Sequence, residues 1–146
     1  MIYVHAFFGG LGLAAGIGSI VAKKGSGIHK KMGKLFSAGM LISSTISIPI
    51  AWMPNHKNLF LFLIGLFTIY LVLSGNRALK YRHKNKPQAM DKVISGGMFI
   101  FSVIMVSIGG FNLTSHLNTG LLYLFFGGFG LFFAIIDFRF FIDPKR

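Results

Sequence analysis

The fold is decided by the stretch VISGGMFIFSVIMVSIGGFNLTSHLNTGLLYLFFGGFGLFFAII at residues 93–136, which runs for 44 residues without Lys, Arg, Asp or Glu. A single helix of that length would measure about 66 Å, at about 1.5 Å per residue, whereas the hydrocarbon core of a bilayer is about 30 Å thick. The stretch must therefore cross a bilayer twice. The polar segment 112–120 supplies the turn between the two crossings.

The rest of the chain has the same character. Of its 146 residues, 53% are hydrophobic and 12% are charged, and the mean hydropathy is +0.68. The fold class that follows is all-α: a polytopic integral membrane protein with a bundle of about five transmembrane helices in one domain, 1–146. The predicted spans are about 2–22, 35–53, 59–79, 93–112 and 120–138.

Basic residues are distributed asymmetrically along this topology. Lys57 stands alone on one side, and the other side holds Lys23, Lys24, Lys30, Lys31, Lys34, Arg77, Lys80, Arg82, Lys84, Lys86, Lys92, Arg139, Lys145 and Arg146. The positive-inside rule places this larger set in the cytoplasm, with the N-terminus outside and the C-terminus cytoplasmic. We therefore expect a multi-pass protein of the cell inner membrane. A net charge of +12 would suggest nucleic acid in a soluble chain, but the loop positions argue against that partner.

The expected partner is the lipid bilayer, with anionic lipids attracted to the two basic loops. Small residues inside the spans indicate close helix packing and allow a homo- or hetero-oligomer. Gly12 and Gly16 form a small-xxx-small step in the first span. The run Phe7–Leu13 resembles Phe125–Leu131 in the last span, at an offset of 118 residues. Either an internal repeat or convergent packing in a chain rich in Gly and Phe explains this likeness.

The second span is the most polar, with several hydroxyl side chains before Pro49. Proline removes a backbone donor and is expected to kink the helix near its outer end. The hydroxyl groups favour a packed seam between helices, with a substrate cavity as the alternative.

Histidines are the candidates for metal chemistry. His5, His56 and His116 fall on the outer side, where they would converge on a transition metal or haem if the spans brought them together. Their spacing gives little support for this, so no cofactor is predicted, and haem or a metal remains an alternative. His29 lies beside basic residues in a cytoplasmic loop, where a solvated interfacial position is expected.

The acidic residues offer one structural candidate. Asp137 ends the last span and Arg77 lies at a similar depth near the end of the third, so an ion pair between them is expected at the cytoplasmic edge. Asp91 neighbours Lys92 and is expected to be a solvated loop residue. No nucleophile–base pair, phosphate loop or paired catalytic carboxylates are present, so an enzyme is not indicated.

Two phrases, Lys23–Lys34 and Gly65–Leu79, together with His5 and Asp137, resemble the DUF2306 family of predicted bacterial membrane proteins. The resemblance implies a polytopic helical membrane protein without a firmly assigned activity. Members of that family tend to continue into a further helix, so this chain looks like a shorter form or a truncated reading frame.

Within the resemblance, three residues are expected to serve helix packing. Gly33 and Gly75 would allow close approach near the inner interface, and Tyr70 would donate a hydrogen bond across a seam.

Three classes of function therefore remain open. The first is a non-catalytic membrane component or assembly partner, the second a small transporter or permease, and the third a haem- or metal-binding redox protein. The lack of an ionisable group at mid-depth argues against the second.

Overall fold

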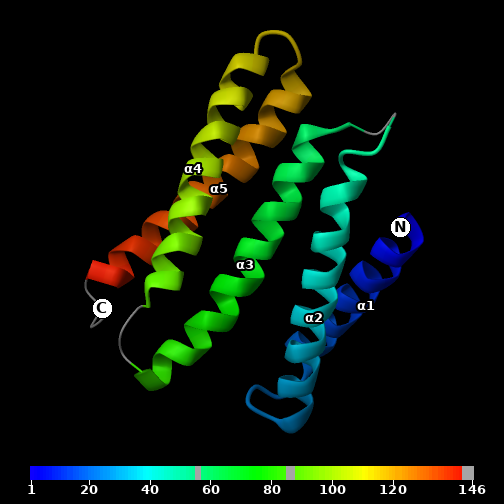
Figure 1. Cartoon of the computed structure of the whole chain (residues 1–146). Helices are drawn as coiled ribbons and strands as arrows, with labels where there is room; N and C mark the ends of the chain where they lie inside the picture. The colour runs from blue at the N-terminus through cyan, green and yellow to red at the C-terminus, as the bar shows by residue number, and fades with distance from the viewer. Residues whose placement is uncertain (55–56, 85–87, 143–146) are drawn as a thin grey trace. The chain divides into compact units, whose positions relative to one another are not determined.

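The computed structural model describes residues 1–54, 57–84 and 88–142, and these residues form five α-helices (Figure 1). The helices are α1 (Ile2–Val21), α2 (Gly27–Ile50), α3 (Leu59–Lys84), α4 (Ala89–Asn112) and α5 (Leu117–Ile142). Within the described ranges, each of the five contains a segment long and apolar enough to cross a membrane. The all-α fold class is thus confirmed.

The chain divides into two compact units, and the boundary lies within α3. Unit 1, Met1–Val72, contains α1, α2 and the first half of α3. Unit 2, Leu73–Arg146, contains the second half of α3, α4 and α5. In each unit the two complete helices pack against each other as an antiparallel hairpin with a short connection (Figure 1).

Two helices begin earlier than the charge-free segments indicated. α2 begins at Gly27 because Gly25 takes a φ of +85° and Ser26 then caps the helix, accepting a hydrogen bond from the His29 N–H at 3.1 Å. α4 begins at Ala89, behind a reciprocal capping box between Gln88 and Asp91. Both first turns are polar, so a search for apolar spans leaves them out.

The seam between α1 and α2 is built on glycine. A Cβ at Gly39 would lie 2.9 Å from the carbonyl oxygen of Phe8 and 3.0 Å from the Cα of Gly12. A Cβ at Gly12 would meet the Met40 backbone nitrogen at 3.2 Å, and one at Gly16 would meet a ring of α2 at 3.0 Å. The close backbone approach predicted from this step is therefore confirmed at Gly12, whereas Gly16 makes room for the Phe36 ring.

The seam between α4 and α5 has the same construction. A Cβ at Gly109 would lie 3.0 Å from the carbonyl oxygen of Gly120, and one at Gly127 would lie 2.9 Å from the Val106 side chain. Both hairpins therefore need glycine on the faces where their helices meet.

Close packing was also expected at Gly33 and Gly75, and it stays a prediction. Gly33 lies inside α2, where a Cβ would make only an ordinary contact of 3.7 Å with the Ser19 hydroxyl. A Cβ at Gly75 would meet no described atom within 4 Å. Tyr70 is 5% exposed, and its hydrogen bond across a seam stays a prediction.

Two hydroxyl groups of α2, those of Ser43 and Ser47, lie in helix seams, whereas Thr45 is exposed. Ser43 is 5% exposed and contacts α1, where a Cβ at Gly9 would lie 3.1 Å from its hydroxyl. Ser47 donates to the Ser44 carbonyl at 2.7 Å and lies against Gly65 of α3. Pro49 occupies the last turn of α2, one residue before the helix ends. This arrangement favours the packed seam over a substrate cavity.

Adjacent glycines in α5 give a matched test of this packing. Gly127→Ala should destabilise unit 2 by about 1–3 kcal/mol, because the new methyl group must displace Val106. Gly128→Ala should be neutral or stabilising by up to about 1 kcal/mol, because a Cβ there meets no described atom within 4 Å. The two variants should be compared by thermal unfolding in the same detergent. Equal melting temperatures would contradict the glycine seam.

Candidate functional site

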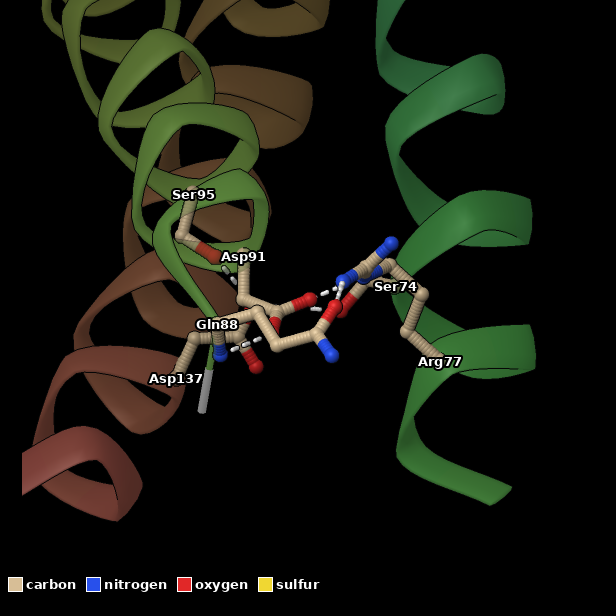
Figure 2. Close-up of polar contacts among 6 residues, drawn as sticks. All are labelled: Ser74, Arg77, Gln88, Asp91, Ser95 and Asp137. Carbon is tan, nitrogen blue, oxygen red and sulfur yellow. Dashed lines mark hydrogen bonds and ion pairs between the residues drawn. The ribbon is translucent and has the colours of Figure 1, made fainter. Parts of the chain in front are cut away.

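Polar side chains from α3, α4 and α5 gather in unit 2. We call this group the carboxylate cluster, and Figure 2 shows its members: Ser74, Arg77, Gln88, Asp91, Ser95 and Asp137. Two of the six are carboxylates and one is a guanidinium. The charged side chains therefore carry one negative charge in excess when both carboxylates are ionised.

Asp91 is the most deeply buried charged residue of the cluster. It is 3% exposed, and it lies in the first turn of α4. Arg77 donates its Nε–H to Oδ1 of Asp91, and the Gln88 backbone N–H donates to Oδ2 at 2.6 Å. The expectation of a solvated loop residue was wrong, because α4 starts two residues before Asp91 and carries the carboxylate into the protein.

Arg77 joins α3 to the start of α4. Its side chain is 25% exposed, so the guanidinium retains contact with the surroundings while its partner carboxylate does not. A second nitrogen, Nη2, donates to Oε1 of Gln88 at 3.2 Å. Arg77 thereby contacts both residues of the capping box. Its ion pair with Asp91 holds α3 against the beginning of α4.

Asp137 enters the cluster from α5. Its Oδ2 accepts hydrogen bonds from the hydroxyls of Ser95 at 2.7 Å and Ser74 at 3.1 Å. A carboxylate at the end of an apolar helix is costly unless such donors solvate it. The predicted ion pair between Arg77 and Asp137 stays a prediction, and both residues belong to one cluster, as their matched depths indicated.

Two histidines of unit 1 join α1 to α2 at opposite ends of the hairpin. His5 Nδ1 lies 2.9 Å from the Ser43 carbonyl oxygen, and the Ser43 hydroxyl donates to the His5 carbonyl at 3.0 Å. His29 Nδ1 lies 2.8 Å from the Ser19 carbonyl oxygen. With the proton on Nδ1, each ring donates to the facing carbonyl oxygen, since a carbonyl oxygen can only accept. His29 is thus part of a helix contact and not only a solvated residue.

The structure describes two of the three candidate ligands for a metal or haem. His5 is engaged with Ser43, His116 is exposed in the connection between α4 and α5, and His56 lies outside the described residues. Within the described ranges, no group of three or more His, Cys, Asp or Glu side chains is placed to hold a metal ion.

Sequence reasoning missed Ser74, Gln88 and Ser95 as members of the cluster. The Gln88-x-x-Asp91 spacing before an apolar run is a capping-box signal, and it could have located the start of α4 and the burial of Asp91. Ser74 and Ser95 are ordinary polar residues in apolar segments, and no local pattern marks them.

Comparison with known proteins gives no match among family models, curated protein sequences or solved structures. The resemblance to the DUF2306 family accordingly stays an expectation from the sequence.

Two double-mutant cycles that share Arg77 test the cluster. Arg77→Gln should destabilise the protein by about 1–3 kcal/mol, because it leaves the Asp91 carboxylate buried without its cation. Combining it with Asp91→Asn should cost less than the sum of the two single changes. The second cycle, with Asp137→Asn, measures the pair predicted from sequence.

Lys92→Gln is the matched control, because Lys92 follows Asp91 in α4 and is exposed. Its effect should be near zero and additive with Arg77→Gln. Additivity in the Asp91 cycle would refute the ion pair as a stabilising contact.

Proposed function

We propose that this chain is a multi-pass membrane protein that serves as a non-catalytic membrane component or assembly partner. The observation that carries the proposal is the apolar character of the outward helix faces. On α1, Phe7 is 66%, Leu13 64% and Ile17 57% exposed, and on α5, Phe125 is 57% and Phe132 56% exposed. Water disfavours such faces over whole helices, whereas lipid chains or apolar faces of partner helices suit them.

The inward polar groups support the same proposal. Histidine, serine, arginine and aspartate side chains bond to groups on neighbouring helices within each unit. Such contacts supply directional links between helices that share no hydrophobic driving force in lipid. The polar residues therefore serve first to hold neighbouring helices together.

Orientation and location follow from the basic residues. We propose the inner membrane, with the N-terminus outside and the connection between α1 and α2 on the cytoplasmic side. Oligomers with other copies or other membrane proteins would use the apolar faces described above.

Single engineered thiols test insertion and orientation together, because the chain has no cysteine. Lys24→Cys lies in the connection between α1 and α2, and Ser115→Cys in that between α4 and α5; both positions are exposed. In intact cells, a membrane-impermeant maleimide should label Ser115→Cys and leave Lys24→Cys unlabelled until the membrane is opened.

Equal labelling at both positions in intact cells would contradict the orientation. Release of the protein from membranes by alkaline carbonate would contradict integral insertion, whichever position is labelled.

A small transporter or permease is the second candidate, and the carboxylate cluster favours it. Ionisable groups within membrane segments often mark pathways for protons or ions. Purified protein in vesicles containing a pH-sensitive dye should then speed proton entry under an imposed pH gradient, and Asp137→Asn should remove that increase. A rate equal to that of protein-free vesicles would exclude proton transport.

A further inference from the structure

Five lysines gather at one end of the α1–α2 hairpin, and we call this surface the lysine end: Lys23, Lys24, Lys30, Lys31 and Lys34. Only five residues separate Val21, the last residue of α1, from Gly27, the first of α2, so all five lysines lie within about two helical turns of the connection. Each of them is exposed. No Asp or Glu precedes Asp91 in the chain, so no side-chain carboxylate in unit 1 neutralises this charge.

The hairpin end is held in shape by local hydrogen bonds. His29 Nδ1 bonds the Ser19 carbonyl at 2.8 Å, which ties the first turn of α2 to the last turns of α1. The Ser26 backbone N–H donates to the Lys23 carbonyl at 3.0 Å and closes the turn. The lysines therefore project from a fixed support.

Large aliphatic side chains stand beside the lysines. Ile20 is 85%, Val21 81% and Ile28 64% exposed, and all three lie in the helix turns next to the connection. Exposed aliphatic groups and ammonium groups at the same level suit the boundary of a bilayer. There the aliphatic groups enter the acyl region while lysine side chains extend to lipid phosphates.

We infer that the lysine end binds the anionic headgroups of a lipid leaflet. The five ammonium groups complement the negative charge of the lipid phosphates. The exposed aliphatic side chains set the depth at which this end of the hairpin lies in the leaflet. The inference rests on the proposed membrane location. Anionic lipids were expected near both basic loops, and the inference assigns their binding to one surface in unit 1. Local enrichment of anionic over neutral lipid should be roughly threefold or more at low salt.

The single tryptophan of the chain allows a local measurement. Trp52 lies just beyond the last residue of α2, Ile50, whereas Ile28 is in the first turn. In the Trp52→Phe/Ile28→Trp variant, the only indole reports on the lysine end. The unchanged protein reports on the opposite end of the same helix. Both are reconstituted in vesicles that contain acyl-brominated phosphatidylglycerol or acyl-brominated phosphatidylcholine, and tryptophan quenching is measured.

At position 28, brominated phosphatidylglycerol should quench more strongly than phosphatidylcholine. The preference should fall at high salt, because screening weakens the attraction. Replacing the five lysines with glutamine should remove it. Lys57→Gln is the single-site control and should leave it unchanged. At Trp52, the two lipids should quench equally.

Equal quenching by both lipids at position 28, with clear quenching by each, would overturn the lipid inference and leave the membrane location intact. Absence of quenching by either lipid at both positions would overturn the membrane location itself. A preference that survives the five substitutions would also overturn the inference, since it would then arise elsewhere.

Discussion

Close approach of helix backbones is the constraint on which both units depend. At Gly39 in unit 1 and at Gly109 in unit 2, an added Cβ would lie within about 3 Å of backbone atoms of the facing helix. Lipid chains are as apolar as leucine, so helices in a bilayer gain little from hiding aliphatic groups. What holds them together is the dense contact that small residues permit, supplemented by hydrogen bonds. The glycines therefore set the helix spacing within which the polar contacts form.

The polar contacts lie toward helix ends, and this placement has a physical reason. His5, His29 and Asp91 all stand in the first turns of their helices. Asp91 accepts from the Gln88 backbone N–H, one of the donors that a helix start leaves without a helical partner, whereas the two histidines bond carbonyl oxygens of the facing helix. Asp137 lies near the end of α5, where two hydroxyls solvate its carboxylate. Each charge is thus kept where its cost is lowest.

Sequence alone predicted the helices better than their contacts. The charge-free segments located five apolar stretches, because length and hydropathy are properties of each segment by itself. Asp91 was misjudged because its burial depends on where α4 begins and on Arg77, which lies 14 residues earlier on another helix. Ser74 and Ser95 could not be foreseen, since only the packing of three helices brings them to Asp137. Helix partners are set by tertiary contacts that a one-dimensional pattern does not contain.

The likeness between Phe7–Leu13 and Phe125–Leu131 can now be divided into facing and outward positions. Gly9 and Gly12 face α2, and their counterparts Gly127 and Gly130 face α4, so a packing requirement accounts for these matches.

The outward positions of the two runs match as well. A Cβ at Gly10 or at Gly128 would meet no described atom within 4 Å, and Phe7 and Phe125 are 66% and 57% exposed. Edge-to-face geometry recurs at adjacent phenylalanines: the ring centroids of Phe7–Phe8, Phe125–Phe126 and Phe132–Phe133 are 5.5, 5.3 and 5.5 Å apart. Convergent packing explains the matches where helices touch, and a composition of 19 Gly and 17 Phe in 146 residues accounts for the outward ones. An internal repeat would explain both sets as well, so both origins of the likeness stay open.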